Sequence, residues 1–191
     1  MLNIDSEPQV VGGLLLARLE YLRHHGGSAL LERVLARLDA PDAEVLRGPI
    51  LPVSWYPRQL RLGVDEAIVS LVSRGDRADV LVGMGRASAD AILDGAKFIK
   101  HGVPQFFLEA VPRLYRAHHT VGRRVYQPLG ENEGIIRTFD ADGLVVPDDC
   151  WTVVGWLQRG LELSGADAVL VTETSCRAAG GPCCEYHCEW H

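Results

Sequence analysis

All five cysteines of this 191-residue chain lie in its last quarter, between Cys150 and Cys188, and the 149 residues before them contain none. Within this stretch, Cys150, Glu173, Cys176 and Cys184 form a spaced set, C-x22-E-x2-C-x7-C. Three thiolates and one carboxylate are acceptable ligands for a tetrahedral zinc ion. A zinc site of this kind constrains the fold, because it requires a helix and a hairpin distant in sequence to meet at one point.

Two other interpretations of the cysteines stay open at this stage. Cysteine is a common core residue, so the five side chains are also compatible with an inert apolar core. In an oxidising compartment they would instead form disulfides. Residues 1–8 carry two acidic residues and no basic one, which argues against a secretory signal. We therefore expect a cytoplasmic protein, in which reduced cysteines favour the metal site.

Composition and charge narrow the classes of partner. The chain is 47% hydrophobic and 23% charged, which is typical of a globular protein, and no apolar run reaches the 18 or so residues of a membrane helix. Its net charge is −6 and its pI is about 5.6. Basic residues gather only in one short group, Arg113, Arg116, Arg123 and Arg124, which we interpret as a solvated helix end. We expect no nucleic-acid partner and no membrane span.

The first 121 residues show a helical pattern. Apolar residues recur every three or four positions over residues 14–24, 30–38, 60–72, 87–93 and 106–115. We expect the first helix to end at His24–Gly27. Pro112 lies inside the last helix, where a kink or an early stop is a risk to this prediction. Gly83-Met84-Gly85 lacks the third glycine of a dinucleotide-binding fingerprint, so we interpret it as the turn that enters the helix over 87–93.

The intervening loop ends in Trp55-Tyr56-Pro57, which we interpret as an aromatic plug over the core, with an interaction surface as the alternative.

From Gly122 onwards the period changes to that of strands. A turn at 130–134 joins two strands into a hairpin that ends near Phe139, and 140–143 forms a second turn. Pro147-Asp148-Asp149 is a helix start, and strands follow over 168–172 and 184–190. This order predicts an α+β fold with helices packed on an antiparallel sheet. We expect a mainly helical part, 1–121, and a zinc-binding part, 122–191, within one compact domain.

The four ligands then sit at defined places. Cys150 opens the helix, Glu173 ends one strand, and Cys184 begins the returning strand. Glu173 and Cys176 are an odd number of positions apart, so a regular strand would place them on opposite faces. The strand must therefore end or bulge near Thr174. We call this arrangement the clasp: a helix start closed by zinc onto the end of a hairpin.

Because side chains alternate between the two faces of a strand, the remaining residues of the last strand can be assigned to one face or the other. Cys184 and Cys188 share a face but stand about 13 Å apart, so Cys188 is expected in the core. Cys183 and His187 take the other face, and Cys183 is expected to point away as a free thiol. An error of one residue in the register would exchange Cys183 and Cys184. We keep Cys183, His187 and Cys188 as alternative ligands.

The pattern Cys150-Trp151, Glu173-x-x-Cys176-Arg177, Gly180-x-Pro182 and Cys184 resembles the 4-vinyl reductase domain, and in particular the zinc-binding form found in phenol-sensing bacterial transcription activators. The resemblance covers about residues 122–190. It implies that Cys150, Glu173, Cys176 and Cys184 hold zinc beside a buried pocket for small aromatic ligands. It also implies a fold related to the heme-NO-binding domains and to small subunits of the TRAPP vesicle-tethering complex.

The first 120 residues are similar to an uncharacterised family of bacterial paralogues, through Trp55-Tyr56-Pro57 and Gly85-Arg86-x-Ser88-Ala89. The chain shows neither the ATPase module nor the helix-turn-helix of the activators, so the resemblance does not extend to direct transcriptional activation.

We expect a zinc-stabilised sensor or adaptor that binds a small hydrophobic or aromatic molecule and acts through a homodimer or a protein partner. Four protein ligands close the metal shell, which indicates a structural zinc and no enzymatic activity. A non-catalytic assembly subunit of the TRAPP type is the alternative. A zinc deaminase is less compatible, because His187-Cys188-Glu189 lacks the cysteine pair that should follow it. A heme sensor is less compatible too, because Tyr115-Arg116-Ala117-His118 departs from the Y-x-S-x-R motif of the heme domains.

Overall fold

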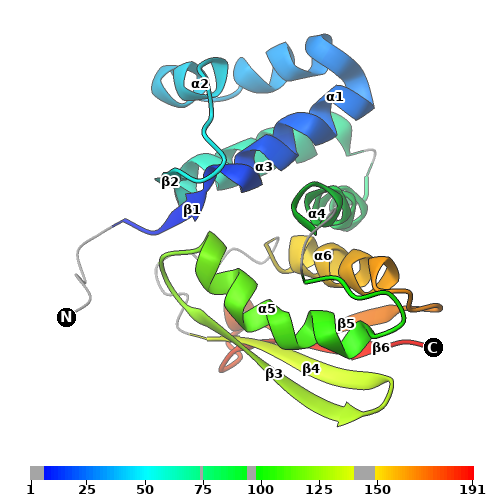
Figure 1. Ribbon diagram of the computed structural model, residues 1–191. Helices are drawn as coiled ribbons and strands as arrows, with labels where there is room; N and C mark the ends of the chain where they lie inside the picture. Colours follow the sequence, from blue (N-terminus) through cyan, green and yellow to red (C-terminus); the bar gives the residue numbers. More distant parts are fainter. Residues whose placement is uncertain (1–6, 74, 94–97, 140–148) are drawn as a thin grey trace.

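The computed structural model describes residues 7–73, 75–93, 98–139 and 149–191. Helices and strands follow one another as β1 (Gln9–Val11), α1 (Gly12–Leu35), α2 (Ala40–Arg47), β2 (Trp55–Pro57), α3 (Arg58–Val72), α4 (Arg77–Leu93), α5 (Pro104–His118), β3 (Arg123–Gly130), β4 (Glu133–Phe139), α6 (Asp149–Leu163), β5 (Leu170–Ser175), a short 3-10 turn η1 (Arg177–Ala179) and β6 (Cys184–Glu189). Figure 1 shows α1, α2 and α3 at one end, the sheet at the other, and α4 and α6 between them. The turn expected at 140–143 and the helix start at Pro147 and Asp148 lie outside the described residues.

The N-terminal helices enclose an apolar cluster of their own, built on fully buried side chains such as Leu15, Leu22, Val64 and Ile68. The break expected after His24 is present, but only as a kink: Gly27 has φ 60°, and helical structure continues on both sides of it within α1. A left-handed φ of this kind is one that glycine adopts without steric cost.

Helix α2 was not predicted. Asp39 caps it by accepting a hydrogen bond from the Asp42 backbone N–H at 2.9 Å, and a proline stands in its first turn. Both are helix-start signals within the stretch that we expected to be a loop.

The expectation of an aromatic plug at Trp55-Tyr56-Pro57 is wrong for Trp55. These three residues form β2, which pairs with β1 in a small antiparallel sheet. Trp55 remains 43% exposed, whereas Tyr56 packs against the N-terminal apolar cluster. Backbone pairing with a distant segment fixes this strand, with Trp55 opposite Val11 and Pro57 opposite Gln9, so local sequence alone gave no sign of it.

A four-stranded antiparallel sheet, in the order β3-β4-β6-β5, forms the other end of the molecule. Helices α5 and α6 lie on one face of it (Figure 1). Alternate residues of the two central strands are buried towards the helices, including Ile136, Tyr186 and Cys188. The prediction of an α+β fold with helices on an antiparallel sheet is confirmed.

Helices α4 and α6 cross at very close range between the two ends. A Cβ added at Gly85 would lie 2.0 Å from the carbonyl oxygen of Thr152, and one added at Gly155 would lie 2.0 Å from that of Val82. The two glycines therefore let the two backbones touch. Our interpretation of Gly83-Met84-Gly85 as a helix-entry turn is wrong, because α4 already begins at Arg77 and these glycines lie inside it.

Pro112 neither ends nor divides its helix. Helix α5 runs from Pro104 to His118, so the predicted helix is present and does not stop early at Pro112. Phe107, Leu108 and Val111 are fully buried against the sheet side of the molecule. Burial of such side chains, at about 1.5–3 kcal/mol each, outweighs a lost backbone hydrogen bond.

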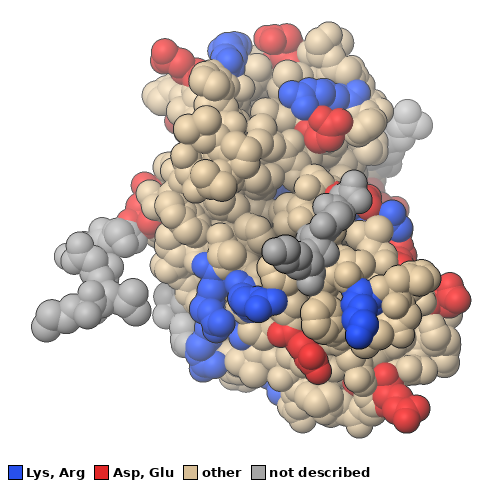
Figure 2. Space-filling model, viewed as in Figure 1, with Lys and Arg blue, Asp and Glu red and all other residues tan. Residues whose placement is uncertain are grey.

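The basic group at the end of α5 is engaged with aromatic rings. The guanidinium groups of Arg113, Arg123 and Arg124 lie 4.8, 4.5 and 4.7 Å from the ring centres of Phe98, Phe139 and Tyr115. Figure 2 shows Lys and Arg side chains gathered over α5, with acidic groups close by. Among the described residues, no helix is both long enough and apolar enough to cross a membrane.

Candidate metal centre and adjoining cavity

Four side chains converge where α6 begins and the β5–β6 hairpin ends. Cys150 comes from the first turn of α6, Glu173 from β5, Cys176 from the turn after β5, and Cys184 from the start of β6. Their candidate ligand atoms all lie within 4.8 Å of one another. The sulfur atoms of Cys150 and Cys176 are 3.8 Å apart. The structure thus brings together the four residues that the sequence singled out.

A β-bulge makes this convergence feasible. Glu173 faces Tyr186 across the hairpin, but Ser175 faces Glu185, so the register shifts between Glu173 and Ser175. The shift occurs at Thr174, where odd spacing required an irregularity. It allows Glu173 and Cys176 to reach the same point.

The alternative ligands lie outside the group of four. Cys188 is fully buried in the sheet-side core, and burial raises the pKa of its thiol to about 12. His187 instead pairs with Glu133, with its Nε2 2.6 Å from the Glu133 carboxylate. Cys183 lies outside the group as a free thiol, and only 5% of the residue is exposed.

The geometry fits a tetrahedral zinc ion. Zinc–sulfur bonds of about 2.3 Å at tetrahedral angles place two sulfur ligands about 3.8 Å apart. The observed separation of Cys150 and Cys176 is 3.8 Å. In addition, Oε1 of Glu173 is buried and has no hydrogen-bond partner in the described part of the chain. A buried carboxylate oxygen without a partner is costly unless a cation or donor satisfies it.

Backbone N–H groups of η1 support the sulfur atoms. Those of Ala178 and Ala179 donate to Cys176 and lower the pKa of its thiol, against the larger effect of burial. The N–H of Arg177 donates to Cys184. The pKa of Cys184 is lowered to about 6, mainly because the Cys150 thiol donates a hydrogen bond to it, and the pKa of Cys150 is correspondingly raised. The pair therefore already favours one thiolate, the form that a metal requires.

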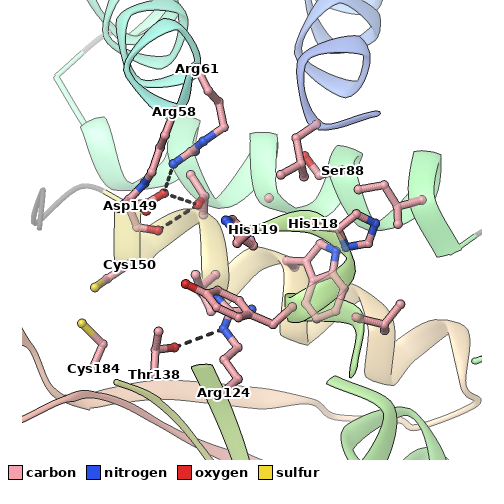
Figure 3. A pocket seen from close by; sticks show the side chains of 18 of the residues that line it. Arg58, Arg61, Ser88, His118, His119, Arg124, Thr138, Asp149, Cys150 and Cys184 are labelled. Atoms are coloured by element: carbon pink, nitrogen blue, oxygen red, sulfur yellow. Dashed lines mark hydrogen bonds and ion pairs between the residues drawn. The ribbon is translucent and has the colours of Figure 1, made fainter. Parts of the chain in front are cut away.

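A cavity of about 110 Å³ adjoins the clasp, and Cys150 and Cys184 both form part of its wall. Figure 3 shows these two sulfur atoms at one side of the cavity, with Arg58 and Arg61 of α3 entering from one wall and Arg124 of β3 from the opposite one. Apolar and aromatic side chains complete the lining, among them Ile92, Leu114, Val153, Trp156 and Tyr186.

A buried network of charges forms the α3 side of this cavity. Asp149, the neighbour of Cys150, accepts hydrogen bonds from Arg58 at 2.7 Å and from Arg61 at 2.6 Å. Arg61 also donates to Asp65 at 2.7 Å, and Asp65 accepts a second bond, of 2.6 Å, from Arg18 of α1. The network therefore links the clasp to the N-terminal helices.

Sequence reasoning missed this network. Arg61 and Asp65 do carry a signal, since they lie four positions apart on the same stretch as the buried Leu60, Val64 and Ile68. Charged residues on the apolar face of a helix are rarely buried unless they are paired.

His118 and His119 line the same cavity at the end of α5. The pKa of His119 is well below its ordinary value, first because the surrounding protein removes it from water, and then because Arg124 and Arg61 lie near. Burial also lowers the pKa of His118. Both imidazoles are therefore neutral at physiological pH.

No family model and no curated protein matches this sequence. Solved structures do. An H-NOX protein from S. oneidensis in the Fe(II)NO ligation state has a TM-score of 0.71 and 11% identity, over 95% of this chain and 99% of that one. The Fe(II) unliganded H-NOX protein from K. algicida has a TM-score of 0.64 and 9% identity, over 95% and 96%. The chain therefore has the fold of the H-NOX proteins, which confirms the expected relation to heme-NO-binding domains. At these identities the likeness concerns the fold alone.

The described residues do not fit a heme. Pockets for drug-sized ligands usually measure about 300–1,000 Å³, and a porphyrin belongs at the upper part of that range. The cavity here is about 110 Å³. It is closer to the roughly 150 Å³ of an engineered cavity that accepts benzene.

Proposed function

We propose that this chain is a zinc-stabilised domain that senses a small molecule and passes the signal to a protein partner or a second copy of itself. The observation that carries the proposal is the shared wall: Cys150 and Cys184 belong both to the clasp and to the cavity. A molecule in the cavity would therefore contact the elements that the zinc holds together. The likeness of the clasp residues to the zinc-binding form of the 4-vinyl reductase domain supports the same proposal.

Zinc would act here as a structural cross-link. Four protein ligands leave no position for a reacting water, so the proposal includes no hydrolytic activity. The ion would join the first turn of α6 to both strands of the hairpin. Because structural zinc binding is worth on the order of 10 kcal/mol, removing it is expected to unfold at least this region.

Asp149 offers a route for the signal. Its carboxylate is bound by two arginines of α3, and it directly precedes Cys150 in α6. A shift of the clasp would therefore act on α3 and, through Asp65, on Arg18 of α1. Helices α1 and α3 belong to the N-terminal part, which we propose as the part that engages the partner.

The experiment compares two cysteine variants of the full-length protein. Cys176→Ser is expected to reduce bound zinc from one ion per chain to well below one, measured by mass spectrometry of metals. Cys183→Ser, whose sulfur lies outside the group of four, is expected to retain it. Addition of a chelator should lower the melting temperature of the wild type and of Cys183→Ser. A metal-free wild type with an unchanged melting temperature would refute the zinc proposal.

Two rival functions are separated by simple measurements. The H-NOX fold favours a heme sensor, and that function predicts a Soret band after incubation with hemin; from the cavity volume we expect none. A TRAPP-like assembly subunit needs no ligand. Native mass spectrometry that finds zinc together with a retained small molecule would support the sensor.

A further inference from the structure

The cavity has an unusual concentration of hydrogen-bond donors for a pocket lined with apolar side chains. Arg58 and Arg61 are only 7% and 3% exposed, yet the Nε atom of each is buried without a hydrogen-bond partner in the described part of the chain. Arg124 enters from the opposite wall (Figure 3) and donates to the neutral hydroxyl of Thr138 at 3.1 Å. Three guanidinium groups thus line one cavity, and two of them have an Nε donor that no described group accepts.

The charged side chains at the cavity wall and directly behind it do not balance. Arg18, Arg58, Arg61, Arg124 and Asp149 line the cavity, and Asp65 pairs with Arg18 and Arg61. The two carboxylates are each shared by two arginines, and within the described residues Arg124 pairs with no carboxylate. Two positive charges remain, and the neutral imidazoles of His118 and His119 do not offset them.

The clasp does not take up these donors. With zinc bound, its three thiolates and one carboxylate would leave a formal charge of −2, and Cys150 and Cys184 face the cavity. Within the described residues, however, Arg58, Arg61 and Arg124 make no hydrogen bond to these sulfur atoms: the first two bind Asp149, and Arg124 binds Thr138. The guanidinium donors are therefore left for another acceptor. A carboxylate offers about four lone-pair sites and matches the fork of an arginine.

The rest of the wall is apolar and limits the size of the ligand. Leu114, Ile92, Trp156 and Tyr186 supply apolar and aromatic surface to the wall. A volume of about 110 Å³ leaves room for about one aromatic ring or a short chain. The wall of the cavity therefore combines cationic side chains with apolar ones.

We infer that the cavity binds a small monocarboxylate, its anionic group held between Arg58, Arg61 and Arg124 and its apolar body against Trp156. The inference rests on the proposed sensing function and names the class of molecule sensed. It departs from the neutral aromatic ligand that the sequence resemblance implied.

The test uses zinc-loaded, full-length protein and isothermal titration calorimetry with four probes. Benzoate and butyrate carry the carboxylate, benzamide has the shape of benzoate without its charge, and phenol is a neutral aromatic. We expect benzoate or butyrate to bind, and benzamide and phenol to bind at least about tenfold more weakly, because charge-assisted hydrogen bonds are roughly twice as strong as neutral ones.

Two neighbouring variants supply the control. Arg124→Gln should weaken carboxylate binding by at least about tenfold. Arg123→Gln should leave it unchanged, because Arg123 stacks over Phe139 and lies outside the cavity. Melting temperatures of both variants show whether each is folded.

The outcomes separate the inference from the proposed function. Phenol or benzamide binding as tightly as benzoate would overturn the carboxylate inference and leave the sensor proposal standing. Equal loss of benzoate binding in folded Arg123→Gln and Arg124→Gln would also overturn it. Absence of binding by all four probes to zinc-loaded protein would overturn the inference, while its zinc content would still support the clasp. A protein that holds no zinc would count against the proposed function independently of any probe.

Discussion

Because α4 and α6 cross closely, replacing glycine with alanine should change the stability of the protein in opposite directions at two positions of α4. Gly83 and Gly85 both lie inside α4, two positions apart. A Cβ at Gly83 would meet Tyr21 at 3.7 Å, which is ordinary van der Waals contact. A Cβ at Gly85 would lie 2.0 Å from the Thr152 carbonyl oxygen. Alanine at the two positions therefore has the same effect on helix propensity and opposite effects on packing.

The magnitudes follow from these contacts. Replacing a helical glycine with alanine stabilises by about 1 kcal/mol, so Gly83→Ala should gain up to about that amount. At Gly85 the same gain is opposed by overpacking, which costs about 1–3 kcal/mol. The obstructing atom is backbone, so α4 and α6 must separate by about 1 Å to restore a contact of 3.0 Å. We therefore take the upper end of the cost and expect Gly85→Ala to lose about 2 kcal/mol.

Urea unfolding of zinc-loaded protein, followed by circular dichroism, measures the difference. The two variants should differ by about 3 kcal/mol, or roughly 6–12 °C in melting temperature for a chain of this size. Gly155→Ala, which would meet Val82 at 2.0 Å, should behave like Gly85→Ala. The double variant should lose less than the sum, because one separation of the helices relieves both clashes. If Gly85→Ala stabilises the protein as Gly83→Ala does, the close-crossing argument is refuted.

Two further predictions concern α6. Arg86 binds Glu162 through two hydrogen bonds of 2.8 and 2.7 Å, and this lowers the pKa of Glu162. The pair is about one third exposed, so Glu162→Gln should cost only about 0.5–1 kcal/mol at pH 7. Because the folded-state pKa is lowered, this contribution is complete above about pH 5 and fades as the pH falls through the folded-state pKa. Urea titrations of both proteins should therefore converge in acid, and a constant difference down to pH 3 would contradict the assignment. Gly160→Ala would place a Cβ 2.1 Å from the fully buried ring of Phe107 and should cost about 1–3 kcal/mol. Adding Phe107→Leu should cost less in that variant than in the wild type, and additive losses would show that the ring is not the obstacle.

The candidate ligand set could be found in the sequence because its information is local. Cysteine spacing selected Cys150, Glu173, Cys176 and Cys184, and strand parity turned the odd interval from Glu173 to Cys176 into a bulge near Thr174, where the register does shift. Whether these residues hold zinc stays a prediction, but their convergence is a property of the structure.

The cavity's chemistry could not be found in the same way. Arg58, Arg61 and Arg124 come from α3 and β3, more than 60 positions apart, and they converge only when the helices pack on the sheet. From sequence alone, Arg124 belonged to a solvated basic group.

The fold class, the hairpin and the residues of the clasp could be predicted, because hydrophobic period, turn residues and cysteine spacing act over a few positions along the chain. The roles of Gly83 and Gly85, the pairing of β1 with β2, and the charges that face the cavity became visible only in the folded molecule. These features depend on contacts between segments far apart in the chain. A glycine that permits a turn and a glycine that permits two backbones to touch look the same in a sequence, and only the neighbouring Thr152 carbonyl distinguishes them.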